Sequence, residues 1–89
     1  MRTIYKYPLQ ITDYQTILIP EFALFTHIAM QYDKPTLWLE VDTSKPVESI
    51  NILCFGTGME IPESMELFHL GTVIDGDFVW HFYSEGESL

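Results

Sequence analysis

The loop Phe55-Gly56-Thr57-Gly58 carries the clearest binding chemistry in this chain. Closely spaced glycines let backbone N–H groups approach an anionic ligand, and Thr57 adds a hydroxyl group. No Gly-Lys-Ser/Thr follows the loop and no third glycine stands at dinucleotide spacing, so it matches neither a P-loop nor a Rossmann fingerprint. Gly56, Thr57 and Gly58 are therefore candidates for holding a phosphate. The structural alternative is a turn or bulge that needs positive φ angles.

Three other side chains could complete such a site. The run from residue 1 to residue 9 predicts a strand, and strand alternation puts Arg2 and Lys6 on the same face. These two cations would complement a phosphate, while Trp80 would stack on a base. The structural alternatives are that Arg2 and Lys6 protect a solvated edge strand from aggregation and that Trp80 belongs to the core.

The three histidines raise the question of a metal site. Zinc sites in proteins use three or four converging ligands, and Cys54 has no C-x-x-C partner. In the hairpin predicted over residues 67–83, strand pairing puts His69 and His81 on opposite faces, so the two rings could not bind one ion. His27 falls in a separate predicted hairpin. We predict no metal ligand and no cofactor.

The sequence offers no pattern of catalytic residues. Cys54 stands between Leu53 and Phe55, which is typical of a buried, small apolar side chain. Neither a nucleophile elbow nor a cysteine-protease pattern surrounds it. No pair of carboxylates has a spacing that indicates general acid–base catalysis. We therefore expect a protein that is not an enzyme.

Two hairpins organise the predicted fold. In the last one, residues 67–83, Asp75-Gly76 would form the two-residue turn, and Gly71 would then lie opposite Trp80, whose indole would cover the bare glycine. In the central one, Asp33-Lys34 would form the turn. The resulting register, in which Ile28 faces Leu39 and His27 faces Glu40, sorts the apolar side chains of residues 24–41 onto one face.

The remaining segments complete an all-β pattern. Short strands are predicted over residues 1–9, 15–20 and 49–55, with turn signals between them. Residues 59–66 would form one helical turn or an irregular connection, and residues 84–89 a frayed tail. About six short strands predict a small antiparallel β-sandwich or a partly open barrel, built as a single domain over residues 1–89.

Composition limits the classes of function. The chain has 13 acidic and four basic side chains and a net charge of −9, which makes general nucleic-acid binding unfavourable. Hydrophobic residues make up 47% of only 89 residues, a proportion that favours a homo-oligomer. A single cysteine, no predicted signal peptide and no apolar run of membrane-spanning length lead us to expect a cytoplasmic protein without membrane contact.

Several motifs, taken in order, resemble one known family. They are the opening MRTIYKYPLQITDYQTILIP, the pairs Leu37-Trp38 and Val41-Asp42, the loop at residues 55–58, and the segments His69-Leu70-Gly71-Thr72 and Phe78-Val79-Trp80-His81. In this combination the chain resembles a family of small proteins encoded by bacteriophages and prophages, a domain of unknown function. Where relatives commonly have glycine-alanine after the second strand, this chain has Glu21-Phe22-Ala23, which places an exposed aromatic side chain near that turn.

The resemblance implies a phage accessory protein that acts in the bacterial cytoplasm. We expect it to bind a host component stoichiometrically, such as a defence-system protein, without catalysis. The alternative is an oligomeric sponge that sequesters a small phosphate-bearing signal such as a cyclic nucleotide. In that case Gly56, Thr57 and Gly58 would hold the phosphate, with Arg2, Lys6 and Trp80 as neighbours.

Overall fold

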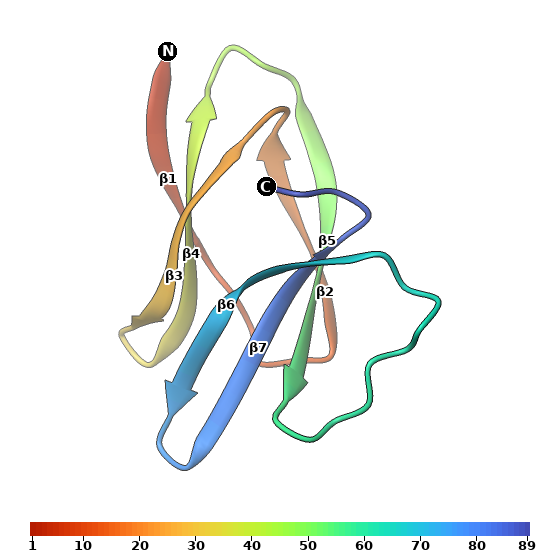
Figure 1. The fold of residues 1–89 in the computed structure, drawn as a ribbon. Coiled ribbons are helices and arrows are strands. Elements are labelled where there is room, and N and C mark those ends of the chain that lie inside the picture. The colour runs from red at the N-terminus through yellow and green to blue at the C-terminus, as the bar shows by residue number, and fades with distance from the viewer.

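The computed structural model describes all residues 1–89 and consists of seven antiparallel strands (Figure 1). The strands are β1 (Arg2–Pro8), β2 (Tyr14–Pro20), β3 (Leu24–Gln31), β4 (Lys34–Asp42), β5 (Val47–Gly56), β6 (Leu67–Asp75) and β7 (Phe78–Glu85). The all-β prediction is confirmed, with seven strands in place of about six. Residues 59–66 form an irregular connection and no helix, and no segment is a helix able to span a membrane.

The strands form two sheets that pack as a small sandwich. Sheet A has the order β1-β4-β3, and sheet B has the order β2-β5-β7-β6. The edge strands β3 and β6 pack beside each other without pairing, which closes one side of the sandwich. The strands β1, β2, β3 and β6 are therefore the four sheet edges.

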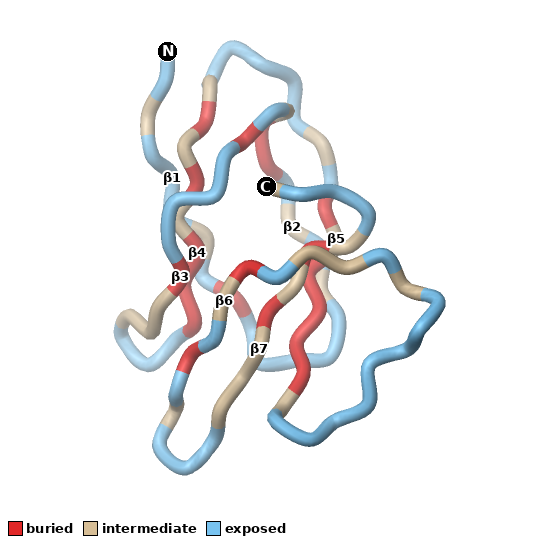
Figure 2. Tube along the Cα trace, in the orientation of Figure 1, coloured by how far each residue is buried: buried red, intermediate tan, exposed pale blue.

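The residues that are buried along the strands of both sheets (Figure 2) form one hydrophobic core cluster between the sheets. On sheet A, β4 contributes Leu37 and Leu39, both fully buried, while on sheet B, Ile52 and Phe82 are also fully buried. Burial of one such side chain contributes roughly 1.5 to 3 kcal/mol. The outer faces of the two sheets carry the candidate functional residues other than Trp80.

The central hairpin has the predicted faces but a different register. Its turn is Tyr32-Asp33, where both residues have positive φ angles of 50° and 62°, as a type I′ turn requires. Ile28 consequently faces Leu37, and His27 faces Trp38 where Glu40 was predicted. A shift of two residues keeps the same side chains on the same face, so Ile28 remains in the core.

A bulge between Phe25 and His27 then changes which side chains at the start of β3 point toward the core and which point toward solvent. Leu24, which the predicted register put in the core, instead pairs with Glu40 and is 57% exposed. The sequence prediction was wrong for this end of the hairpin because it assumed an uninterrupted ladder.

The last hairpin also departs from the predicted register. Asp75 pairs with Phe78, so the turn is Gly76-Asp77, and Gly71 faces Phe82 in place of Trp80. The prediction that the indole covers Gly71 is therefore wrong. A bulge between His69 and Gly71 inserts Leu70 into β6 and changes the face on which His69 lies.

The C-terminal segment differs from the expected frayed tail. β7 continues to Glu85, and the chain then curls back toward the sandwich (Figure 1). The amide of Gly86 donates to the carbonyl of Glu66 at 2.8 Å, the hydroxyl of Ser84 donates to the carbonyl of Glu87 at 2.6 Å, and Leu89 packs against the core. Backbone and side-chain contacts thus hold the tail in place.

Candidate binding face

The glycine loop in the structure has little free hydrogen-bonding capacity. The amide of Thr57 donates to the carbonyl of Val79 at 3.3 Å, and the amide of Met59 donates to the carbonyl of Gly56 at 3.0 Å. The amide of Gly56 contacts Met59 Sδ at 3.0 Å, which leaves only the Gly58 amide without a partner. A phosphate cradle needs several convergent N–H groups, so the loop serves mainly as a tight turn, with a φ of 90° at Gly58.

The side chain of Thr57 contributes to a hydroxyl–imidazole cluster. Its Oγ1 lies 2.8 Å from His81 Nε2, and Thr72 Oγ1 lies 2.8 Å from His81 Nδ1. A neutral imidazole has one donor and one acceptor nitrogen, so one threonine hydroxyl accepts from the ring while the other donates to it. The two bonds fix the ring of His81 on the outer face of sheet B.

His69 joins this cluster because of the β6 bulge. Its Nε2 is 3.5 Å from Thr72 Oγ1, and its ring centre is 5.1 Å from that of Tyr83. His69 and His81 therefore lie on the same face of the sheet, which corrects the prediction that they lie on opposite faces. Tyr83 in turn meets Phe55 edge-on, with ring centres 5.8 Å apart.

These contacts form a row of aromatic, imidazole and hydroxyl groups across sheet B. A shallow hollow of about 230 Å³ opens beside the row. It is lined by Phe55, Gly56, Thr57, Gly58, Met59, Ile61, His81 and Tyr83. No group of three or more His, Cys, Asp or Glu side chains is arranged to hold a metal ion. We call this outer surface of sheet B, with the adjoining 59–66 segment, the sheet B face.

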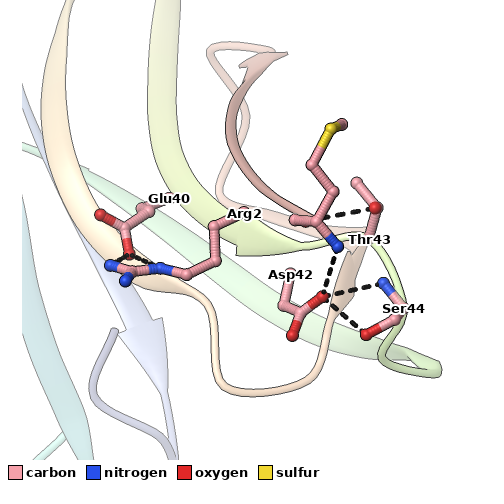
Figure 3. A network of polar contacts seen from close by, with 6 residues as sticks. Arg2, Glu40, Asp42, Thr43 and Ser44 are labelled. Atoms are coloured by element: carbon pink, nitrogen blue, oxygen red, sulfur yellow. Dashed lines mark hydrogen bonds and ion pairs between the residues drawn. The ribbon is translucent and has the colours of Figure 1, made fainter.

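Arg2 and Lys6 lie on the other sheet. They share one face of β1, as strand alternation predicted, and this is the outer face of sheet A. Arg2 donates to Glu40 through Nε at 3.1 Å (Figure 3). Lys6 donates to Gln31 at 3.0 Å and lies 5.7 Å from the ring centre of Tyr32. The structure therefore does not bring these cations together with the glycine loop.

Beside Arg2, the polar network of Figure 3 anchors the start of the chain. Asp42 Oδ1 accepts from the Ser44 hydroxyl at 2.7 Å, from the Ser44 amide at 3.0 Å and from the N-terminal ammonium at 3.2 Å. These bonds, chiefly those from Ser44, lower the pKa of Asp42 to about 2. The cluster holds β1 against β4.

Trp80 points away from the sheet B face. It is half-buried against the core, and its ring stacks on Phe78 with centres 5.8 Å apart and planes 17° apart. Its Nε1 atom is buried without a hydrogen-bond partner. Of the six predicted site residues, the structure thus groups Gly56, Thr57 and Gly58 at one loop, packs Trp80 against Gly56 on the inner side of sheet B, and places Arg2 and Lys6 on sheet A.

Charge is distributed unevenly along the chain, a feature that the sequence motifs did not indicate. Residues 46–89 carry eight of the 13 acidic side chains and none of the four Lys and Arg side chains. Glu60, Glu63 and Glu66 are exposed in the segment that adjoins the hollow, and Glu85 accepts from Asn51 at 3.2 Å on the face itself. Because β2 contains no charged residue, the four strands of sheet B and the loops that join β5, β6 and β7 contain no Lys or Arg to offset these acids. The signal, the absence of Lys and Arg after Lys45, is visible in the sequence.

Comparison with known families gives one match. A family model described as Domain of unknown function (DUF7352) matches residues 1–88, nearly the whole chain. Comparison with curated proteins and comparison with solved structures each give no match.

Proposed function

We propose that this chain, which belongs to the family described as Domain of unknown function (DUF7352), acts without catalysis by stoichiometric binding of a protein partner with a basic surface. The observation that carries the proposal is the segregation of charge: the sheet B face and its loops hold acidic side chains with no Lys or Arg among them. Such a one-signed surface attracts a cationic partner over distances near the Debye length of about 8 to 10 Å and repels nucleic acid.

The side chains at the centre of this face suit a protein contact. The half-buried Tyr83 and the exposed Tyr14 offer aromatic rings, on which guanidinium groups stack. Thr57, Thr72 and the histidines add hydrogen-bonding groups that can recognise polar atoms. Carboxylates beside aromatic rings match an Arg-rich partner surface, because Arg pairs with carboxylates and stacks on rings.

The partner class follows from the phage and prophage resemblance. A small phage protein without catalytic groups would meet the proteins of the host cytoplasm, and inhibition of a defence-system protein would require a stoichiometric complex. A host protein that acts on nucleic acid would bear a basic surface, which an acidic face could occupy as a mimic.

The alternative, a phosphate-binding sponge, gains no support from the geometry. Its two cations, Arg2 and Lys6, lie on sheet A, and three of the four amides of residues 56–59 already have partners. A phosphate on the sheet B face would meet carboxylates instead of cations.

Charge reversal with affinity capture from host cells tests the proposal. The double variant Glu60→Lys/Glu63→Lys changes the sheet B face, and the double variant Asp33→Lys/Glu21→Lys makes the same change of charge in the turns at the two ends of β3. We expect the native chain and the second variant to recover a basic protein in near-stoichiometric amount. The first variant should recover at least tenfold less of this protein, and the amount that the native chain recovers should fall as the salt concentration rises. Equal loss in both variants, or recovery of no protein, would contradict the proposal.

A further inference from the structure

Glu48 is an acidic side chain on the side of β5 that faces the core. Side chains alternate along a strand, so Glu48 points the same way as the buried Ile50 and Ile52. Its register partner on β2, Ile19, is also fully buried. The Oε1 atom of Glu48 is buried and has no hydrogen-bond partner. An ionised carboxylate is unfavourable at such a position, because burial without a partner penalises the charged form.

The C-terminal segment, residues 86–89, brings a second carboxyl group to Glu48. Backbone and side-chain contacts fold this segment back toward the sandwich (Figure 1). In this position the carboxyl group of Glu87 lies within hydrogen-bonding reach of that of Glu48. Ionised carboxylates accept hydrogen bonds but do not donate them, so a bond between the two groups needs a shared proton. The folded-back segment thus fits the protonated pair, whereas two ionised groups at this separation repel each other.

No cationic side chain compensates Glu48. β2, which pairs with this part of β5, contains no charged residue. Lys45 Nζ lies 5.8 Å from the ring centre of Phe22, in a hollow that Glu21 also lines. Glu85 accepts a hydrogen bond on the outer face of sheet B, and the two ion pairs of the molecule lie on sheet A. Only a proton is therefore left to neutralise the contact between the two carboxyl groups.

We propose that residues 86–89 form a proton-controlled strap, which is closed while Glu48 and Glu87 share a proton and opens when both are ionised. In the closed form, burial and the neighbouring Glu87 raise the pKa of Glu48 above its ordinary value of 4.5. The closed form is consequently stabilised below that pH, and the stabilisation is lost as the pH rises through the raised pKa. Opening removes Leu89 from the core and exposes the hydroxyl of Ser84, a residue that is fully buried under the closed strap.

Amide hydrogen exchange of the full chain, followed residue by residue by NMR from about pH 4.5 to about pH 7.5, tests the proposal. The readout is the protection of the Gly86 amide, which donates to the carbonyl of Glu66 in the closed strap, relative to an unstructured chain at the same pH. We expect this protection to fall at least fivefold as the pH rises. Protection of the Leu9 amide, which donates to the carbonyl of Pro35 at 2.7 Å, should stay constant.

Two variants remove the need for the proton. A glutamine amide donates a hydrogen bond at every pH in this range, so Glu48→Gln and Glu87→Gln should each keep the strap closed, with constant protection of Gly86. Glu87 is exposed, so its variant tests the proposal even where the inward-facing variant fails to fold. The matched control Glu63→Gln removes an exposed carboxylate from the 59–66 segment and should retain the native pH dependence.

Two results would overturn the proposal. One is constant protection of Gly86 across the pH range in the native chain. The other is a fall in protection that persists in both the Glu48→Gln and the Glu87→Gln variants. The measurement uses no binding partner, so its failure leaves the proposed function to its own test.

Discussion

Trp80 lies across the backbone of Gly56, with its Cζ3 atom 3.2 Å from the position that a Cβ atom at residue 56 would take. The two residues are directly paired between β7 and β5. The missing side chain thus leaves room for the indole, in the arrangement by which an aromatic ring covers a strand glycine. Gly71, for which this arrangement was predicted, is covered by a different side chain: Ile28 of β3 reaches over it from the facing sheet.

The variant Gly71→Ala should be the more destabilising of the two glycine substitutions. A methyl group there would collide with Ile28 Cγ2, whereas at Gly56 it would meet Trp80 Cζ3 at 3.2 Å and Met59 Sδ at 3.3 Å, which can yield slightly. Overpacking of a core costs about 1 to 3 kcal/mol. We expect the free energy of unfolding, measured by urea denaturation, to fall by about 3 kcal/mol in Gly71→Ala and by about 1 kcal/mol in Gly56→Ala.

A double-mutant cycle identifies the collision as the cause. In the Ile28→Ala background the offending methyl group is absent, so the additional cost of Gly71→Ala should fall by more than half. Equal costs in the two backgrounds would show that the collision with Ile28 is not responsible.

Bulges mark the limit of what pairing rules could predict from this sequence. The turn signals and the alternation of apolar residues predicted both hairpins, and a register error of two residues left Ile28 in the core because side chains alternate with period two. The one inserted residue, Leu70, shifts the alternation of side chains along β6 by one position. His69 therefore lies on the same face as His81, and not on the opposite face that was predicted. Gly71 was the available signal, since a glycine inside a strand pattern often accompanies a bulge.

The candidate site was partly predictable for a related reason. Thr57 was singled out for its hydroxyl, and the structure gives that hydroxyl a partner, His81, from a strand 24 residues away in sequence. The contact depends on the register between β5 and β7, strands that are not joined by a turn, and no local pattern specifies such a register. Arg2 and Lys6 were correctly placed on one face of β1, but which sheet β1 joins depends on the topology of the whole chain.

Asp42 should make stability sensitive to strong acid. Its pKa is lowered to about 2 by bonds from Ser44 and the N-terminal ammonium, so the folded state favours the ionised form more than the unfolded state does. The resulting stabilisation is complete above the ordinary value of 3.8 and is lost as pH falls toward about 2. We expect the difference in melting temperature between the native chain and Asp42→Asn to be constant between about pH 5 and pH 7 and to shrink steadily as the pH falls below that range. A difference that does not change down to pH 2 would contradict this account.

The thiol of Cys54 should be unreactive in the folded protein. Cys54 is only 4% exposed, and burial, aided by the charge of Asp13, raises its pKa to about 11. At pH 8 the thiolate fraction is then on the order of one in a thousand, compared with about a quarter for an ordinary cysteine. Iodoacetamide should therefore label the folded chain at least a hundredfold more slowly than the urea-unfolded chain, as followed by mass spectrometry. Comparable rates in the two states would show that Cys54 is accessible and ionised.

Phe22 adopts a backbone conformation that suits glycine. Its φ is 62°, in the left-handed region, and its side chain is 76% exposed with Lys45 Nζ 5.8 Å from the ring centre. A Cβ atom in this region costs about 1 to 2 kcal/mol, of which the extra unfolded-state entropy of glycine offsets a part. The variant Phe22→Gly should therefore unfold with a free energy about 1 kcal/mol higher than that of the control Phe22→Ala. Both variants lose the ring and its contact with Lys45, so their difference in thermal or urea denaturation isolates the backbone, and an alanine variant as stable as the glycine variant would show that residue 22 is not strained.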